Sequence, residues 1–272
     1  MPYQALLVKE VFGKGRNNPP QAIAPNGSMI IINADDWGRS RIETDAAISC
    51  YREGRITSVS AMVFMEDSVR AADLAKDAGM DVGLHLNLSQ RFTEGEVGAG
   101  LLPEYHNRIV RFLTLNKYYL LIYNPVLRKQ FRYVYQAQVE EFLRLYGRPP
   151  SHIDGHHHKH LCTNMLLDGV IPEGERVRRT FSFWPGGKGL PIRTYWRLVD
   201  LWLARRYRLT DFFFALSHCL QADCLMYVAE LAKAATVELM THPVKGEEYA
   251  CLMSDDFFAM LGTLRTGTYS LV

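Results

Sequence analysis

The 272-residue sequence lacks a run of about 18 uninterrupted apolar residues, the length that a membrane-spanning helix requires. Its formal net charge is only +2, so we expect no bulk attraction to nucleic acid or to a membrane. The five cysteines are scattered and form no CxxC pair, which favours free thiols in a reducing cytoplasm over a disulfide framework. Together these absences favour a globular cytoplasmic protein that binds no nucleic acid.

Short apolar runs alternate with amphipathic helical patterns from residue 29 onward. The runs predict strands at 29–34, 57–64, 81–88, 151–154, 176–180, 211–216, 237–240 and 268–272. The helical patterns predict helices at 41–52, 68–77, 126–146, 161–168, 192–208 and 255–265. Continuous apolar runs such as MIIINA are typical of strands buried on both faces of a parallel sheet. We therefore predict a single α/β domain, a TIM-like (β/α) barrel of seven or eight strands that is distorted from the regular form.

Two segments lie outside this alternation. Residues 1–28 are rich in Gly, Pro and Asn and are expected to form a poorly ordered leader before a barrel domain that spans 29–272. Residues 102–147 are expected to form a helical excursion that is rich in aromatic and basic side chains. Its aromatic rings could bind sugars and its arginines could bind phosphates. We favour a structural role, in which the excursion covers the barrel or forms a homodimer interface.

The stretch from Ser151 to His160, SHIDGHHHKH, concentrates five histidines and one aspartate in ten residues. Histidine is costly to bury without a partner, whereas it is the commonest metal ligand and the usual acid or base near neutral pH. His156 and His160 have the i, i+4 spacing that places two imidazoles on one helical face, a spacing that holds zinc in other proteins. The cluster therefore indicates a chemical site rather than a solvated loop.

Reactive side chains stand at or near the ends of four predicted strands: Asp35 with Asp36, His85, the 154–160 cluster and His242. In parallel α/β barrels the active site lies at the carboxyl ends of the strands, so these groups are expected to meet there. Each has another explanation when taken alone. The aspartates could cap the next helix, His85 could be a hydrogen-bonded core residue, and a residue before proline often marks a strand exit.

One carboxylate with two neutral imidazoles suits zinc or another divalent first-row metal. Three protein ligands leave a position for water, which the metal makes acidic enough to attack at neutral pH. A second carboxylate can take the proton of this water, and a histidine on the opposite side can protonate the leaving group. The set predicts metal-assisted hydrolysis of an amide or an ester.

Five motifs, in order along the chain, resemble those of the YdjC/ChbG-type (ChbG/HpnK) carbohydrate deacetylases: NADDWG (33–38), TS (57–58), GLHLNL (83–88), HIDGHHHKH (152–160) and THP (241–243). The resemblance covers residues 29–272. It implies a (β/α) barrel related to polysaccharide deacetylases, and metal-dependent removal of N-acetyl groups from an amino sugar that is free or carried on a lipid or glycan.

Carried over by position, the resemblance implies that Asp36, His85 and His156 hold one divalent metal ion, zinc or magnesium. It also implies that Asp35 is the general base, that His242 is the general acid and that Arg178 orients Asp35. Trp37 departs from the family pattern, in which Phe is usual. This departure and the aromatic excursion bear on the substrate more than on the chemistry.

Two other functions compete with deacetylation. A metallohydrolase of another bond, a phosphoester or another amide, is weaker, because the chain has no phosphate-cradling motif and few carboxylates for a two-metal site. A barrel that binds sugar without turnover is disfavoured by the presence of Asp35 and His242, since binding alone requires neither.

Overall fold

We analysed a computed structural model of the chain, which describes residues 28–93, 100–183 and 190–272. Its centre is a six-stranded parallel sheet with the order β4-β3-β2-β1-β6-β5. The strands are β1 (Met29–Trp37), β2 (Ser58–Ala61), β3 (Asp81–Leu86), β4 (Ile153–Gly155), β5 (Phe212–Ala215) and β6 (Thr236–Thr241). The predicted parallel α/β fold is confirmed.

The first strand occupies the middle of this sheet. All nine residues of β1 are buried, as the continuous apolar run predicted. On one side β1 pairs with β2, and on the other with β6, where Ala34 lies opposite Thr241. The carboxyl end of β1 is therefore flanked by the ends of two other parallel strands, which is the arrangement that brings distant residues into one site.

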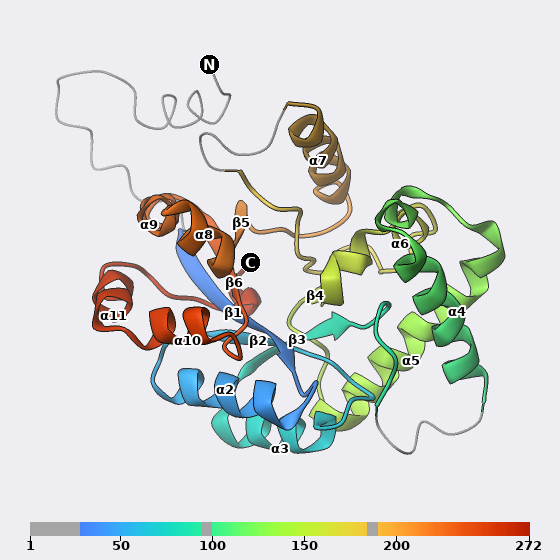
Figure 1. The fold of residues 1–272 in the computed structure, drawn as a ribbon, viewed down its shortest axis with the longest axis horizontal. Helices are drawn as coiled ribbons and strands as arrows, with labels where there is room; N and C mark the ends of the chain where they lie inside the picture. Colours follow the sequence, from blue (N-terminus) through green and yellow to red (C-terminus); the bar gives the residue numbers. More distant parts are fainter. Residues whose placement is uncertain (1–27, 94–99, 184–189) are drawn as a thin grey trace.

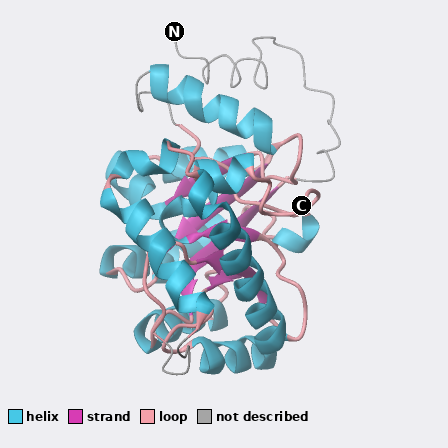
Figure 2. Cartoon of the chain, turned by 90° about the vertical axis from the view of Figure 1, so that its right-hand side faces the viewer, coloured by secondary structure: helices cyan, strands magenta, loops and turns pink. Residues whose placement is uncertain are grey.

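Helices surround the sheet, as Figures 1 and 2 show. They are α2 (Arg41–Arg52), α3 (Ser68–Ala78), α4 (Leu101–Leu115), α5 (Arg128–Tyr146), α6 (Thr163–Leu167), α7 (Leu190–Leu203), α8 (Leu216–Ala222), α9 (Leu225–Ala232), α10 (Gly246–Met253) and α11 (Asp255–Leu261). α2 has the predicted bounds. α3 and α5 end at Gly79 and Gly147, which adopt the left-handed conformation that ends helices and favours glycine. Of the helices in the described part of the chain, none is both long and apolar enough to span a bilayer.

The described residues contain six strands, fewer than the seven or eight that the sequence predicted. The predicted strand at 176–180 is reduced to isolated bridges, of Val177 with Ile153 and of Arg176 with Arg208. Further along, the Ser182 amide donates to the Phe213 carbonyl in β5. The segment 176–182 thus links the two edge strands, β4 and β5, by single contacts rather than by a continuous ladder.

One predicted strand is wrong. Residues 268–272 contain the 3-10 helix η4 (Tyr269–Leu271) instead. Aromatic and β-branched residues favour strands only where neighbouring residues fit them. Here the Tyr269 ring stacks on His152, with ring centroids 3.7 Å apart, and packs against Met29 and Ile31 of β1, so this residue is buried against the sheet without joining it as a strand. The predicted leader, residues 1–28, lies outside the described residues except for Ser28.

The excursion predicted at 102–147 consists of α4, the 3-10 helices η1 (Lys117–Leu121) and η2 (Pro125–Leu127), and α5. It stands at the right-hand edge of the molecule in Figure 1, where α4 packs along α5. The excursion also contacts α3 and β3 through α5, and it bonds η3 (His156–Leu161) and α6.

Candidate metal centre

Two adjacent aspartates enter one site at the carboxyl end of β1. Successive side chains on a regular strand point to opposite faces. Asp36 departs from this rule because its φ is +65°, and the pairing register of β1 with β2 shifts between Ala34 and Trp37. Asp35 and Asp36 are both almost completely buried and both contact His85. The local turn therefore aims two neighbouring carboxylates at the same point.

Asp36, His85 and His156 offer three ligand atoms that lie within 4.8 Å of one another. Asp36 Oδ1 is 2.8 Å from His156 Nδ1 and 3.4 Å from His85 Nε2. Despite this proximity, Oδ1 is a buried atom without a hydrogen-bond partner. The three atoms converge on a point without satisfying one another, and a buried acceptor left in this state is costly. A cation at that point would satisfy it, and this donor set fits a divalent metal.

The other ring nitrogen of His85 is held by Asp154. His85 Nδ1 lies 2.8 Å from Asp154 Oδ1, and the Ser60 hydroxyl donates to Asp154 Oδ2 at 2.9 Å. A carboxylate in this position fixes the ring and directs Nε2 toward Asp36, an arrangement that is common among metal-ligating histidines. Burial lowers the pKa of His85, but the carboxylates of Asp154 and Asp35 outweigh burial and raise this pKa to about 10.

Arg178 is completely buried and joins three carboxylates. Its Nη1 and Nη2 donate to the two oxygens of Asp35 at 2.8 and 2.7 Å, which is a bidentate pair. Arg178 also lies 2.6 Å from an oxygen of Asp154 and 2.6 Å from one of Glu238. The Asn33 amide donates to Asp35 Oδ1 as well, at 2.9 Å. Asp35 is thereby fixed in position, 4.0 Å from His85 Nε2.

The centre carries an excess of carboxyl groups. Three of them, Asp35, Asp154 and Glu238, contact the guanidinium of Arg178, and the fourth, Asp36, contacts His85, His156 and Arg39. Burial raises the pKa of Asp36, but the imidazoles of His156 and His85 outweigh it and hold this pKa well below its usual range. Burial raises the pKa of Glu238 to about 7 in spite of Arg178. An additional cation would lower the electrostatic free energy of such a cluster.

His242 follows β6 directly and so stands beside the end of β1, since Thr241 pairs with Ala34. Its side chain is partly exposed, in contrast to the buried ligand group. The His242 amide donates to Glu248 Oε2 at 2.7 Å, and His242 Nδ1 lies 3.8 Å from Glu248 Oε1 and 3.3 Å from Lys245 Nζ. Burial raises the pKa of Glu248, but the contacts with His242 outweigh it and lower this pKa.

The remaining histidines of the 151–160 cluster have other partners. His160 Nε2 lies 3.0 Å from the Arg178 carbonyl oxygen, so it faces away from the ligand group although it is four residues from His156. His157 and His158 have positive φ, so the backbone between His156 and His160 is not regularly helical. His157 pairs with Ser89, and His158 packs against Phe181. The i, i+4 pair of His156 and His160 is therefore not brought together as a ligand pair.

Several residues at the centre were not assigned roles from the sequence. Asp154 lies inside the histidine cluster, so its position was a usable signal. Glu238 is a charged residue within the apolar run VELM, and a buried charge in such a strand usually has a partner. Glu248 lies in a surface-like helical segment and gave no signal.

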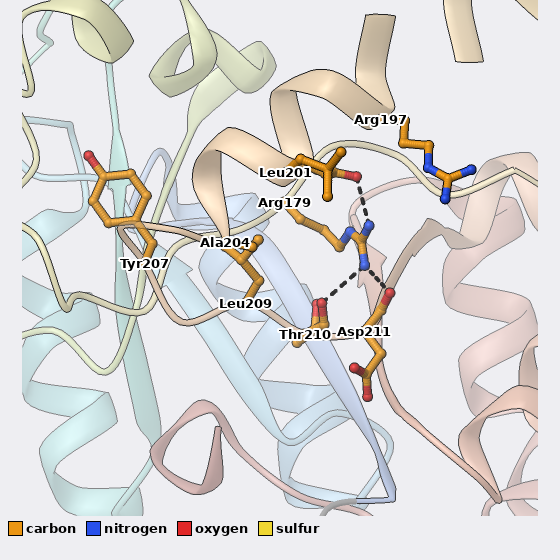
Figure 3. Close-up of a pocket in the computed structure, with 9 residues that line it drawn as sticks. Arg179, Arg197, Leu201, Ala204, Tyr207, Leu209, Thr210 and Asp211 are labelled. Atoms are coloured by element: carbon orange, nitrogen blue, oxygen red, sulfur yellow. Dashed lines mark hydrogen bonds and ion pairs between the residues drawn. The ribbon is translucent and has the colours of Figure 1, made fainter. Parts of the chain in front are cut away.

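A separate pocket of about 460 Å³ lies beside α7. Figure 3 shows Arg179 pointing into it and bonding Asp211 and Thr210. Arg179 also pairs with Asp200 at 2.7 Å. None of its lining residues belongs to the metal centre, so consecutive arginines, 178 and 179, serve different parts of the molecule.

The sheet and its buried carboxylate–imidazole group define an α/β protein with a candidate metal site at the strand ends. A family model described as YdjC-like protein matches residues 29–262, and the chain belongs to this family. The family resemblance noted in the sequence motifs is confirmed.

Known relatives agree with this assignment. The chain is 34% identical to a chitooligosaccharide deacetylase of Proteus mirabilis, with 79% of this chain and 81% of the relative covered. It is 29% identical to a carbohydrate deacetylase of Vibrio campbellii, with 86% and 85% covered. A crystal structure from Enterococcus faecalis, described as a cellobiose-phosphate cleavage protein, has a TM-score of 0.62 at 17% identity, over 89% of this chain and 98% of that one. This last likeness concerns the fold.

Proposed function

We propose that this protein is a metal-dependent hydrolase that removes N-acetyl groups from an amino sugar or an N-acetylated oligosaccharide. The observation that carries the proposal is the convergence of Asp36, His85 and His156 beside a second, separately held carboxylate, Asp35. The names of the YdjC-like relatives, which are carbohydrate and chitooligosaccharide deacetylases, support the choice of bond and substrate class.

In this proposal Asp36, His85 and His156 hold one divalent ion, zinc or magnesium, and Asp154 keeps His85 oriented. The ion, when bound, supplies an acidified water and polarises the acetyl carbonyl group. Asp35, fixed by both donors of Arg178, accepts a proton from the attacking water. The water oxygen first forms a bond to the carbonyl carbon, and the carbon–nitrogen bond then breaks as His242 gives a proton to the leaving nitrogen. The products are acetate and a free amine.

The positions of the two proton-transfer residues suit their opposite roles. Asp35 is buried beside the ligand group, where it meets water held there. His242 is partly exposed at the neighbouring strand end, where a sugar can approach from solvent. Glu248 accepts a hydrogen bond from the His242 backbone amide and lies 3.8 Å from the His242 ring, so it fixes the position of this residue.

The direct test measures acetate release from N-acetylglucosamine oligomers by the purified protein. Removal of metal with a chelator should abolish the release, and addition of zinc or magnesium should restore it. Release that persists in fully metal-free protein would contradict the metal-dependent mechanism. Hydrolysis of a phosphoester substrate without acetate release would favour a phosphoesterase instead.

A further inference from the structure

The region between α4 and α5 exposes large apolar side chains on an ordered surface. Five of them lie within twelve residues, with exposures between 47% and 76%: Leu115, Tyr118, Leu121, Ile122 and Val126. η1 contains no buried residue. We call these five side chains the apolar face. Exposed apolar residues are normal when scattered, whereas a concentration of them marks an interaction surface.

The backbone that carries the apolar face is held by hydrogen bonds from α6. The Thr163 hydroxyl donates to the Leu120 carbonyl at 3.0 Å, and Asn164 exchanges two hydrogen bonds with the backbone of Asn124 at 3.0 and 2.9 Å. The Tyr123 hydroxyl donates to Asp168 at 3.0 Å. Polar groups of the segment therefore bond to α6 and to Asp168 beyond its end, while the five side chains of the apolar face remain exposed. The exposure is a property of the folded segment and not of a frayed end.

The charge carried by the segment around the apolar face is positive. Residues 105–135 contain six Lys and Arg and no Asp or Glu, and two of the six pair with acids outside this range, Arg108 with Glu104 and Arg128 with Asp168. Arg111, Lys117, Lys129 and Arg132 are all exposed there. Lys117 Nζ lies 5.1 Å from the centre of the Tyr118 ring, so a cation and an exposed aromatic ring are presented together. The chain as a whole carries a net charge of only +2, so this positive charge is local.

We propose that the apolar face and its basic border dock the protein on an anionic lipid bilayer surface. Apolar side chains that enter the headgroup region together with lysines and arginines that meet lipid phosphates are the two requirements of such binding. A second copy fits the face less well, because a two-fold interface would place the basic residues of one chain against those of the other. This proposal does not depend on the proposed reaction.

The helix that leads into the apolar face contacts the element that carries a candidate metal ligand. Lys159, in η3, donates to the Leu113 carbonyl in α4 at 3.2 Å, and η3 also carries the metal-site residue His156. α4, whose last residue Leu115 belongs to the apolar face, is thus bonded to the element that supplies one of the three candidate ligands.

The test is cosedimentation of the full-length protein with vesicles of phosphatidylcholine alone or mixed with phosphatidylglycerol. We expect binding to the mixed vesicles, weak binding to the neutral ones, and loss at high salt. Leu121→Asp with Ile122→Asp should weaken binding at least roughly tenfold. Lys117→Glu and Lys129→Glu should each weaken it roughly fivefold or more.

Matched controls come from other surfaces. Ile42→Asp changes an aliphatic side chain that is 70% exposed on α2, and Lys76→Glu changes an exposed lysine on α3. Both should bind vesicles like the unmodified protein, and circular dichroism should show that all variants are folded. Absence of binding to the mixed vesicles, or equal loss in the Ile42→Asp control, would overturn the proposal. Sedimentation that shows dimers dissociated by the Leu121→Asp and Ile122→Asp changes, without vesicle binding, would assign the face to a second copy.

Discussion

Replacement of Asp35 by Asn separates the roles of the two adjacent aspartates. Asn has nearly the same size as Asp but cannot accept a proton at neutral pH. In the structure, Asp35 Oδ1 accepts from Arg178 and Asn33, and Oδ2 accepts from Arg178. An amide oxygen at the Oδ1 position keeps two of these three bonds, whereas the amide nitrogen at the Oδ2 position faces an arginine donor.

The expected cost to stability is therefore one charge-assisted hydrogen bond, about 1.5–3 kcal/mol in the free energy of unfolding. Each kcal/mol lowers Tm by about 2–4 °C in a domain of comparable size. The expected loss of transition-state stabilisation is larger than this loss of folding stability. Loss of a general base typically lowers kcat by about 10²–10⁴, which is about 3–5 kcal/mol of transition-state stabilisation.

The assay combines three measurements on Asp35→Asn and on a matched variant, Asp36→Asn. Elemental analysis gives metal content, thermal unfolding gives Tm, and acetate release gives kcat. Asp35→Asn should keep its metal, because Asp36, His85 and His156 are unchanged, and should lose most of kcat. Asp36→Asn should lose metal affinity as well. An Asp35→Asn protein with nearly unchanged kcat, or one without metal, would show that the base lies elsewhere or that the roles are exchanged.

Three further predictions concern the surroundings of the centre. His85→Ala should abolish metal binding and His160→Ala should retain it, because His160 bonds the Arg178 carbonyl; stoichiometric metal in the first and loss in the second would reverse the assignment. Burial raises the pKa of Glu238 from 4.5 to about 7, so the folded state binds the extra proton and stability should fall as pH rises between these values. Glu238→Gln should flatten that part of the Tm profile, and an unchanged slope would contradict the assignment. Shortening the 105–135 segment should alter KM or substrate choice with metal content unchanged; unaltered kinetics together with a changed oligomeric state would indicate a subunit interface.

Local patterns predicted most of the regular elements. The buried apolar run at the start of β1 and the glycines that end α3 and α5 are short-range signals, and they depend on steric and burial rules that apply within a few residues. Strand-end positions also predicted that Asp35, His85 and His156 would lie near one another, since parallel strands place their carboxyl ends at one edge of the sheet.

The tertiary structure alone determined which of these groups touch. Arg178 meets Asp35 across 143 residues of sequence, and it meets Glu238 across 60, so no local pattern could specify either contact. Tyr269 was predicted to lie in a strand from its local propensity, but its ring stacks on His152 and its hydroxyl donates to Glu238. The left-handed turn at Asp36 arises where the register of the central pair shifts, and this turn is what brings two neighbouring carboxylates to one point. The sequence by itself determined which carboxylates and imidazoles stand at the strand ends. Packing between distant strands determined their hydrogen-bond and ion-pair partners, because side-chain pairing in a buried site depends on the whole sheet.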